Sequence, residues 1–557
     1  MSTREHRRRT GAQALVDSLV AHDVDTVFGI PGIQLDPLYD AFFEQSNQLR
    51  VIHTRHEQGA AFMAMGYAQA SGRSGVFAVV PGPGLLNAMA AVSTARTANL
   101  PVLGLTGQIP SYQIGLGYGM AHELEDQLGM ARGVVDHAVR AEHPAQVPEL
   151  MQATFKAMHG GRPAPAVFEM APDVLAASAL VADASIGGSP RERGWGCPML
   201  PDADAVQRAV DLVGRARRPA IFVGGGIFDA VEPLRRLAER LNAPVVMSPN
   251  GGGALPADHP LALGMIAGQQ IWPDIDLALV IGTRFMSPAL AWGREGELPV
   301  IRIDADPMQI VKPRPPQVAI ASDACIGIEA ILEALGDGQL GSSEHAERVA
   351  EIKRETERTF ATLQPQADLA RAIRSALPRD GIVAVDVTQM ASFVRYGGFP
   401  IYAPRSLLAP GYQATLGFAL PAALGAKVAQ PDRKVIALCG DGGFMFTMQE
   451  LSTAVHHRIP VVVIVFDNAS FGNVKTIQKN SYGGRHIAVD LSNPDFAAMA
   501  QTFGMHGERA ETPAALESAL TRCLALDGPA LIQVPIGEVP SIWKLVKRPP
   551  SQGQTRG

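Results

Sequence analysis

This sequence has few cysteines, no excess of positive charge and no long apolar run. The four cysteines are scattered without a CxxC pair, so neither a disulfide framework nor a cysteine-rich zinc site is expected. The formal net charge of -6 speaks against a general attraction to nucleic acid or to an anionic membrane. The longest apolar run, Ile459 to Phe466, is far shorter than the roughly 20 residues of a membrane-spanning helix. We expect a cytoplasmic protein that binds neither nucleic acid nor membrane.

Near the amino terminus, the basic stretch Arg4 to Arg9 has no apolar segment after it. It therefore lacks the pattern of a signal peptide. We expect a frayed, solvated end of the chain at this stretch.

Glycine and proline are abundant, with 56 and 42 residues in a chain of 557. The absence of a three-residue period excludes collagen. Seams rich in these residues, at 184–201 and 336–366, divide the chain into segments 10–180, 200–335 and 367–540. At roughly 150 residues per domain, this division is consistent with three domains.

Each segment alternates short β-rich runs with longer helical patterns. The expected strands are 26–29, 75–80 and 102–106 in the first segment, 220–223, 244–247, 277–281 and 300–303 in the second, and 382–385, 434–439, 461–466 and 530–535 in the third. Continuous apolar strands that alternate with helices are typical of parallel sheets covered on both faces. The sequence predicts an α/β fold of three doubly wound parallel-sheet domains, which bind ligands beyond the carboxyl ends of their strands.

The strongest local signal follows the expected strand 434–439. This strand runs into Gly440-Asp441-Gly442-Gly443, and the next strand along the chain runs into Asp467-Asn468. Because adjacent parallel strands end at the same edge of a sheet, Asp441 and Asn468 should lie side by side. The glycines allow close backbone approach to a phosphate, and the side-chain oxygens suit Mg²⁺. An N-capping Asp in a tight turn is the alternative for Asp441 alone.

This pattern resembles the binding motif for thiamine diphosphate (ThDP), and the chain is similar to ThDP-dependent enzymes of the acetolactate synthase type (large catalytic subunit). An independent match, His56 to Ala68, resembles their cofactor-activating segment. Shorter matches are Gly29-Ile30-Pro31-Gly32, Pro81-Gly82-Pro83-Gly84 with Asn87, and Gly161-Arg162-Pro163. The resemblance covers essentially the whole chain. It implies a pyrimidine-binding domain at 10–180, a central Rossmann-like domain at 200–335 and a diphosphate- and Mg²⁺-binding domain at 367–540.

The resemblance assigns roles to individual residues. Glu57 would be catalytic, because its carboxyl group would hydrogen-bond the cofactor pyrimidine and make the cofactor's own amino group basic. Leu416 would be the bulky apolar residue that brings the two cofactor rings together. The implied metal ligands are Asp441, Asn468 and Ser470, the last through its backbone carbonyl. Further implied cofactor contacts are Pro31, Gly32, Pro81, Asn87, Thr388, Gln389, Gly440, Gly442, Gly443, Phe471 and Gly472.

Bland alternatives exist for two of these assignments. Glu57 on its own is typical of the first turn of a helix, where an acidic side chain is favoured by the helix dipole. Leu416 on its own is typical of an ordinary core position. In addition, Met390 stands where the family commonly has a histidine, and Thr388, Gln389 or Ser392 could compensate.

FAD is left open as a further cofactor. Gly224-Gly225-Gly226 follows a strand but does not form the GxGxxG fingerprint. Gly282-Thr283-Arg284-Phe285 resembles part of the segment that contacts FAD in relatives. The family's Gly-Met-His-Gly is represented here by Gly264 to Gly268 with Ile266, and its Asp-Asp-Arg is replaced by Met286-Ser287-Pro288.

The substrate-facing positions also depart from the family. The arginine with which genuine acetolactate synthases position a second 2-oxo acid is missing, and their tryptophan is represented by Ile477. His122 and Glu123 fall near a Phe-Gln pair of relatives, and they could act as general acid and base or bind a polar substrate. A solvated start of a helix is the alternative. The pair His456-His457 is expected on the surface.

The resulting hypothesis is a ThDP- and Mg²⁺-dependent lyase or transferase that acts on a 2-oxo acid. Decarboxylation would yield an enamine, which would then be ligated to a second carbonyl. The alternatives are a non-oxidative decarboxylase that releases an aldehyde, an FAD-dependent oxidative decarboxylase, and an inactive ThDP-binding relative. The presence of Glu57, Asp441 and Asn468 favours catalysis. The resemblance also implies a homodimer or a dimer of dimers (homotetramer) with active sites at the subunit interface.

Overall fold

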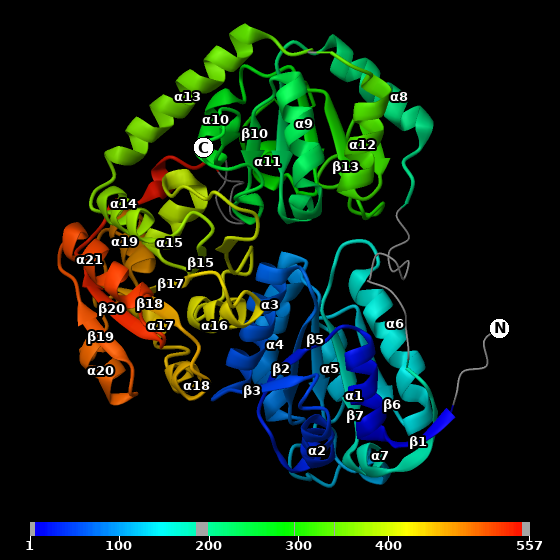
Figure 1. Cartoon of the computed structure of the whole chain (residues 1–557). Helices are drawn as coiled ribbons and strands as arrows, with labels where there is room; N and C mark the ends of the chain where they lie inside the picture. The colour runs from blue at the N-terminus through cyan, green and yellow to red at the C-terminus, as the bar shows by residue number, and fades with distance from the viewer. Residues whose placement is uncertain (1–5, 185–198, 295, 339, 548–557) are drawn as a thin grey trace.

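The structure is a computed structural model that describes residues 6–184, 199–294, 296–338 and 340–547. Three α/β units follow one another along the chain, each built on a six-stranded parallel sheet with helices on its faces (Figure 1). This architecture confirms the predicted fold class. We refer to the N-terminal unit (6–184), the central unit (199–338) and the C-terminal unit (366–547). Most of the first expected seam, 184–201, lies outside the described residues.

The N-terminal unit has the strand order β3-β2-β4-β5-β7-β6. Its strands are β2 (Thr26–Gly29), β3 (Arg50–His53), β4 (Gly75–Val79), β5 (Val102–Thr106), β6 (His137–Ala141) and β7 (Ala166–Met170). Its helices are α1 (Gly11–Ala21), α2 (Asp36–Glu44), α3 (Glu57–Ser71), α4 (Pro83–Ala98), α5 (Gln127–Arg132), α6 (Val147–His159) and α7 (Pro172–Ala176). The three strands expected from the sequence are present as β2, β4 and β5.

The central unit has the strand order β11-β10-β9-β12-β13-β14. Its strands are β9 (Pro219–Val223), β10 (Val245–Met247), β11 (Ala262–Leu263), β12 (Leu277–Ile281), β13 (Val300–Asp304) and β14 (Val318–Ala321). Its helices are α8 (Ala203–Arg215), α9 (Val231–Leu241), α10 (Met265–Ile271), α11 (Met286–Ala291) and α12 (Ala324–Leu335). Renumbered within the unit, the order is 3-2-1-4-5-6, which is the order of Rossmann folds.

The C-terminal unit has the strand order β16-β15-β17-β18-β20-β19. Its strands are β15 (Ile382–Val385), β16 (Leu407–Leu408), β17 (Val435–Gly440), β18 (Val461–Asp467), β19 (His506–Arg509) and β20 (Ala530–Pro535). Its helices are α14 (Gln366–Ala376), α15 (Gln389–Phe393), α16 (Ala419–Ala429), α17 (Asp441–Phe444), α18 (Glu450–His456), α19 (Gly472–Ser481), α20 (Phe496–Thr502) and α21 (Pro513–Leu524). Within the unit, this order is the same as that of the N-terminal unit.

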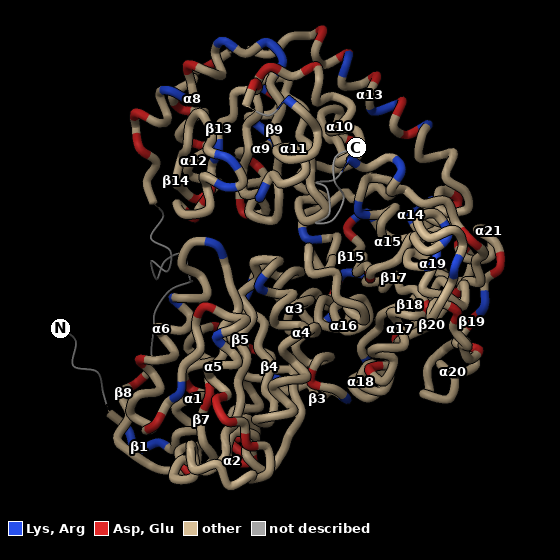
Figure 2. The backbone as a smooth tube through the Cα atoms, turned by 180° about the vertical axis from the view of Figure 1, so that it is seen from behind, with Lys and Arg blue, Asp and Glu red and all other residues tan. Residues whose placement is uncertain are grey.

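A single long helix, α13 (Ser343–Ala361), connects the central and C-terminal units (Figure 1). Figure 2 shows acidic and basic residues alternating along α13 and α8 on the outside of the molecule, whereas the central strands carry few charges. Such a charge distribution is typical of solvent-facing helices around apolar sheets. None of the described helices combines the length and the apolar character needed to cross a membrane.

The expectation of a frayed amino terminus is wrong from His6 onward. Strand β1 (His6–Thr10) pairs antiparallel with β8 (Ser178–Ala182), which lies near the end of the N-terminal unit. The ladder pairs one edge of His6–Thr10 with β8, and Arg9 donates a hydrogen bond to Asp17 at 2.9 Å. A partner so distant in sequence gives no local signal.

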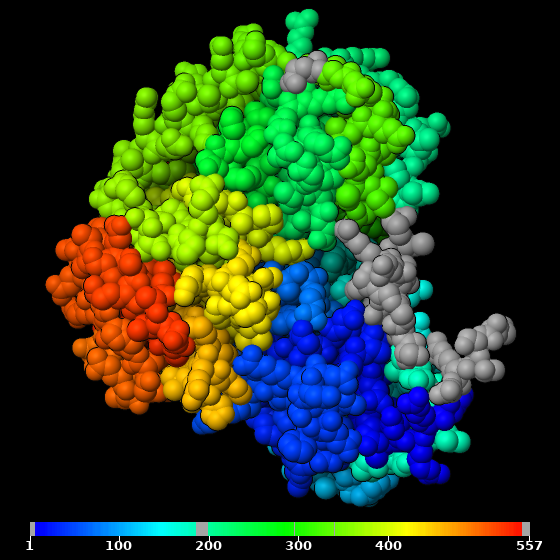
Figure 3. All heavy atoms as spheres, viewed as in Figure 1, coloured from blue at the N-terminus to red at the C-terminus, as the bar shows by residue number. Residues whose placement is uncertain are grey.

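The N- and C-terminal units are joined by two helices that pack backbone against backbone. Helices α3 and α16 lie side by side, and both are rich in alanine and glycine (Figure 1). A Cβ added at Gly66 would lie 2.0 Å from the carbonyl oxygen of Ala422, and one added at Gly425 would lie 1.9 Å from that of Met63. Figure 3 shows the two units in direct contact along this junction. Part of the glycine surplus therefore allows this close packing, which places the start of α3.

Candidate active site

Two neighbouring strand ends of the C-terminal unit bring the expected metal ligands together. Strands β17 and β18 pair in parallel with Gly440 opposite Phe466. The N–H of Ser470 donates to Asp441 Oδ2 at 3.2 Å, and the hydroxyl of Ser470 donates to Asn468 Oδ1 at 3.1 Å. Asp441, Asn468 and Ser470 thus lie at one edge of the sheet, as the sequence predicts. We call this group the metal-edge cluster.

Two further residues of this edge were missed by sequence reasoning. The amide nitrogen of Asn493 donates to Asp441 Oδ2 at 2.7 Å and to Asp467 Oδ1 at 2.8 Å. Asn493 therefore fixes the orientation of both carboxylates. Sequence reasoning names Asp467 with Asn468 at the end of the strand but gives it no role, whereas Asn493 lies in the loop before α20 and gives no sequence signal.

The electrostatics of the metal-edge cluster suit a divalent cation. Burial and the neighbouring charge of Asp467 raise the pKa of Asp441, while hydrogen bonds from Asn493 and from the N–H groups of Gly442 and Ser470 act in the opposite direction. A bound cation would offset the cost of holding these carboxylates out of water. The available ligands are the carboxylate oxygens of Asp441, the amide oxygen of Asn468 and the expected backbone carbonyl of Ser470, and such oxygen ligands are those that Mg²⁺ prefers.

Glycines keep side chains out of the space beside this cluster. A Cβ added at Gly442 would lie 2.7 Å from the ring of Phe471, and one added at Gly472 would lie 2.9 Å from the amide nitrogen of Asn468. One added at Gly443 would lie 3.1 Å from the carboxylate of Asp386. Backbone N–H groups can therefore approach a bound anion closely along 440–443, where α17 begins.

The turn after β15 lies at the same edge of the sheet, because β15 is the other neighbour of β17. Thr388 caps α15 by accepting a hydrogen bond from the N–H of Ala391 at 2.9 Å. Gln389 lies beside Gly472, whose added Cβ would be 3.4 Å from its side-chain oxygen. Met390 is buried in the core, and the hydroxyl of Ser392 donates back to the carbonyl of Thr388. Thr388 and Gln389 are therefore the polar side chains of this turn that remain near the site.

Leu416 lies half-buried in the loop before α16, where the C-terminal unit contacts the N-terminal unit. The hydroxyls of Thr415 and Thr94 lie 2.7 Å apart, which connects the loop to α4. The hydroxyl of Thr447 donates to the carbonyl of Gly417 at 2.9 Å, and Gly417 has a φ of 81° that favours glycine. Leu416 is thus held by contacts on both sides of it.

Glu57 is the first residue of α3 and lies in the N-terminal unit. His56 caps the helix by accepting from the N–H of Gln58, and Glu57 Oε2 accepts from Asn87 Nδ2 at 3.0 Å. The side chain of Glu57 is 17% exposed, so it can still meet a ligand. We call Glu57 and Asn87 the activation pair. In this structure Asn87 orients the carboxylate of Glu57.

Small residues surround the activation pair. Added Cβ atoms at Gly32 and Gly84 would lie 2.3 and 2.6 Å from the two methyl groups of Val80, and the one at Gly84 would lie 3.6 Å from Glu57 Oε1. The segments containing Pro31 and Pro81 therefore meet at Val80, and the second of them also reaches Glu57.

The loop with His122 packs over Gly82. His122 has a φ of 69°, and its carbonyl oxygen would lie 2.5 Å from a Cβ added at Gly82. Among the residues that the structure describes, none forms a hydrogen bond with the buried ring nitrogen Nδ1 of His122. In contrast, the carboxylate of Glu123 accepts from the N–H of Met120 at 2.7 Å, so it stabilises its own loop. Of the two expected acid–base residues, His122 is the one with an unused polar atom.

A buried network that the sequence did not reveal supports this loop. Gln127 accepts from the N–H of Gly82 at 2.7 Å and donates to Glu169 at 2.7 Å. Glu169 is fully buried and forms an ion pair with Arg140. Because moving Gly82 would leave buried polar groups of this network without their hydrogen bonds, the network fixes the backbone position of Gly82.

A large cavity of about 1650 Å³ lies elsewhere, between the central unit and the two terminal units. Its lining includes Gly224, Met265, Arg284 and Met286, and it contains none of the metal-edge cluster or the activation pair. The glycines after β9 have a structural use, because a Cβ at Gly224 would lie 2.7 Å from the carbonyl oxygen of Gly282. The cavity is large enough for a dinucleotide. However, Met286 lines it at the position where the resembling family begins its Asp-Asp-Arg segment.

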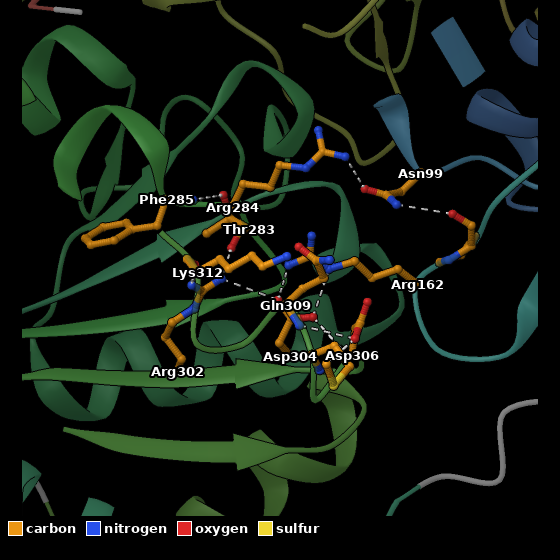
Figure 4. A network of polar contacts seen from close by, with 12 residues as sticks. Asn99, Arg162, Thr283, Arg284, Phe285, Arg302, Asp304, Asp306, Gln309 and Lys312 are labelled. Carbon is orange, nitrogen blue, oxygen red and sulfur yellow. Dashed lines mark hydrogen bonds and ion pairs between the residues drawn. The ribbon is translucent and has the colours of Figure 1, made fainter. Parts of the chain in front are cut away.

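Polar contacts between residues that line this cavity connect the central unit to the N-terminal unit (Figure 4). Arg162 forms a two-pronged ion pair with Asp304, with N–O distances of 3.0 and 2.6 Å. Arg284 donates to the carbonyl of Thr97 at 2.5 Å and to Asn99 at 2.9 Å. The expected motif residue Arg162 thus holds two units together.

Comparison with protein families gives three matches along the chain. The model of the N-terminal TPP binding domain of thiamine pyrophosphate enzymes matches residues 9–130, and that of the central domain matches residues 206–335. The model of the C-terminal TPP binding domain matches residues 386–534. These ranges fall within the three α/β units.

Curated proteins align over nearly the full chain. A probable 2-ketoarginine decarboxylase of Pseudomonas aeruginosa is 37% identical over 94% of both chains. A probable acetolactate synthase large subunit of Methanococcus aeolicus is 33% identical over 94% of this chain and 92% of its own. The large subunit of acetolactate synthase isozyme 1 of Escherichia coli is 31% identical over 100% of this chain and 98% of its own.

Proposed function

Because this chain belongs to the thiamine pyrophosphate enzymes of the acetolactate synthase type, we propose that it uses ThDP and Mg²⁺ to decarboxylate a 2-oxo acid and to ligate the product to a second carbonyl. The observation that carries the proposal is the metal-edge cluster beside a glycine-lined helix start. Carboxylate and amide oxygens for a cation lie next to backbone N–H groups for a diphosphate.

In this proposal Asp441, Asn468 and Ser470 hold the cation, and the backbone of 440–443 holds the diphosphate. When bound, ThDP supplies a carbon nucleophile and an electron sink for the loss of CO₂. Glu57 shares a proton with the pyrimidine ring, and Asn87 keeps the carboxylate of Glu57 aimed. The half-buried Leu416 would offer its apolar side chain to the cofactor.

His122 is proposed to serve the substrate. Its buried Nδ1 has no partner in the described residues, and its loop packs on the segment beside Glu57. It can therefore donate a proton to, or accept one from, a substrate carboxylate or carbonyl group. Glu123 is proposed to shape this loop, because its carboxylate is engaged with the backbone of Met120.

A second candidate is simple decarboxylation of a 2-oxo acid with a cationic side chain. The relative from Pseudomonas aeruginosa is named a probable 2-ketoarginine decarboxylase. The loop that follows His122 is acidic, with Glu125 and Asp126 both exposed. Such a loop suits a guanidinium or ammonium group. In addition, Ile477 occupies the position of the tryptophan that serves a second 2-oxo acid in acetolactate synthases.

Product analysis separates the two candidates. The purified chain, supplied with ThDP and Mg²⁺, is incubated with pyruvate, 2-oxobutyrate, branched 2-oxo acids and 2-ketoarginine, and CO₂, aldehyde and acyloin products are measured. Ligation predicts CO₂ with little free aldehyde and with a 2-hydroxy-3-oxo product. Aldehyde in equal amount to CO₂ identifies the decarboxylase. If none of these acids releases CO₂, the proposed function is wrong.

We also propose that each active site combines two copies of the chain. The hydrogen bonds described for Glu57 remain within the N-terminal unit, and those of Asp441 remain within the C-terminal unit. The interlocked helices α3 and α16 hold these units in a set arrangement within one chain. Mixing inactive Glu57→Gln and Asp441→Ala chains, unfolded and refolded together, should restore roughly a quarter of the activity through hybrid dimers. No recovery would indicate sites within single chains.

A further inference from the structure

Three histidines outside the proposed ThDP site converge at the boundary between the N- and C-terminal units. His53 is the last residue of β3, while His456 ends α18 and His457 follows it. The distance from His457 Nε2 to His53 Nδ1 is 3.1 Å, and one ring nitrogen from each of the three residues lies within 4.8 Å of the others. The expectation that both helix histidines simply face solvent is incomplete, because His457 is half-buried against His53.

The three imidazole rings form a closed triangle. Their centroids are 4.5, 4.7 and 4.8 Å apart, and every pair meets edge to face. A hydrogen bond between His53 and His457 accounts for one side of the triangle. It does not account for His456, which is exposed and still packs against both other rings.

This spacing suits a tetrahedral transition-metal site. Bonds of about 2.0–2.1 Å from zinc to imidazole nitrogens place neighbouring ligand nitrogens about 3.4 Å apart. The His53–His457 distance of 3.1 Å is already close to that value, and a ring nitrogen of the exposed His456 lies within 4.8 Å of both. Imidazole ligands favour Zn²⁺, Ni²⁺ and Cu²⁺ over Mg²⁺, so this site is chemically distinct from the metal-edge cluster.

We propose that His53, His456 and His457 bind a divalent transition-metal ion of the zinc class, with water in the fourth position. The ion would connect β3 of the N-terminal unit to α18 of the C-terminal unit. The strand β3 leads through Arg55 directly into Glu57, so the metal would also hold the turn that carries the activation pair.

The surroundings of the triad set the expected affinity. Burial lowers the pKa of His457 to about 4, with His53, His456 and Arg50 acting in the same direction. The lone pair of His457 is therefore available near neutral pH. Positive neighbours also repel a cation, so we expect binding in the micromolar range rather than that of four-ligand structural zinc sites.

Cobalt spectroscopy tests the proposal directly. Chain without a histidine tag is stripped of metal, supplied with excess Mg²⁺ to occupy oxygen sites, and titrated with Co²⁺. We expect one equivalent to give the intense visible bands of tetrahedral Co²⁺, and Zn²⁺ to abolish them. His53→Gln and His457→Gln should each weaken Co²⁺ binding at least tenfold. Zn²⁺ should raise the melting temperature of the parent chain and not that of either variant.

A matched control comes from a second cluster in the same chain. His506, Glu508 and Cys523 also place ligand atoms within 4.8 Å of one another. Burial raises the pKa of the Cys523 thiol to about 12, which makes it a poor ligand. The variant His506→Gln should bind Co²⁺ as the parent does. Absence of tetrahedral bands in the parent chain, or bands that survive in both His53→Gln and His457→Gln, overturns the proposal. Circular dichroism of the metal-free variants shows whether they are folded.

Discussion

The carboxylate of Glu450 accepts the backbone N–H of Arg55, with both carboxylate oxygens 3.2 Å from the nitrogen. This contact crosses from α18 of the C-terminal unit to the turn before Glu57. The side chain of Glu450 is fully buried and also accepts the hydroxyl of Thr453 at 2.6 Å. It fits only because position 59 is glycine, where an added Cβ would lie 2.3 Å from Glu450 Oε1. Glu450 is thus a positioning residue for the start of α3.

The pH dependence of stability should reveal the burial of Glu450. Burial raises its pKa from 4.5 to about 7, so between these values the folded chain holds a proton that the unfolded chain releases. Stability therefore falls as the pH rises through this window, at about 1.4 kcal/mol per pH unit. In Glu450→Gln this contribution is absent. We measure the free energy of unfolding by chemical denaturation at pH 4.5 and at pH 7.5. The difference, variant minus parent, should increase by roughly 2–3 kcal/mol from the lower to the higher pH.

The exposed residue Glu333 provides the control for this experiment. The stability of Glu333→Gln should follow that of the parent at every pH. Parallel curves for the parent and Glu450→Gln would show that Glu450 titrates normally.

Loss of Asn493 should weaken metal binding without removing a proposed ligand. Asn493→Ala frees Asp441 and Asp467 from their shared amide donor, and removal of such supporting groups typically costs 10–100-fold in metal affinity. We expect the Mg²⁺ concentration for half-maximal reconstitution with ThDP to rise about tenfold or more. The exposed Asn480→Ala serves as the matched control. An unchanged Mg²⁺ requirement in Asn493→Ala would show that these carboxylates do not need orientation.

Glu57→Gln should separate cofactor binding from turnover. The amide keeps the shape of the side chain and its contact with Asn87, but it cannot share a proton as a carboxylic acid does. We expect kcat to fall about 100-fold or more, while ThDP binding measured by calorimetry changes little. Activity close to that of the parent would contradict the proposed role of Glu57.

The ion pair between Arg162 and Asp304 should matter for stability. Asp304 is 3% exposed and Arg162 is 16% exposed, so Arg162→Met leaves a buried carboxylate without its main partner. We expect a loss of about 3 kcal/mol in the free energy of unfolding. Arg236→Met removes the exposed pair with Glu329 and should cost less than about 1 kcal/mol. Equal effects of the two substitutions would show that the cavity wall gains little from the buried pair.

The large cavity leads to a prediction about flavin. Gly224 and Gly226 after β9 make close backbone contacts with Gly282, and Met286 lines the wall at the position of the family's acidic residue. We therefore expect the purified chain to show no flavin absorbance in the visible range and no gain of activity with added FAD. A stoichiometric flavin spectrum would instead support FAD-dependent oxidative decarboxylation.

Much of the fold was predictable because parallel sheets leave a strong pattern. Buried strands such as Val461–Asp467 are nearly continuous apolar runs, and the turns that follow them carry the polar residues. The proximity of Asp441 and Asn468 followed from one rule about neighbouring parallel strands.

Contacts between distant segments were not predictable in the same way. Asn493, Glu450 and the Gln127–Glu169 pair lie in ordinary-looking stretches, and their partners are remote in sequence. The pairing of β1 with β8 was missed for the same reason. Only the three-dimensional arrangement shows which polar side chain supports which loop.

The reciprocal fit of Gly66 and Gly425 has a mechanical consequence. The backbone of each helix fills the space that a methyl group on the other helix would need. A change of side-chain rotamers therefore cannot make room for α3 to slide along α16. The two terminal units must therefore travel as one rigid block. Any opening that admits a substrate is left to the surface loops, such as the one that carries His122, and to tilting of the central unit about its ion pairs.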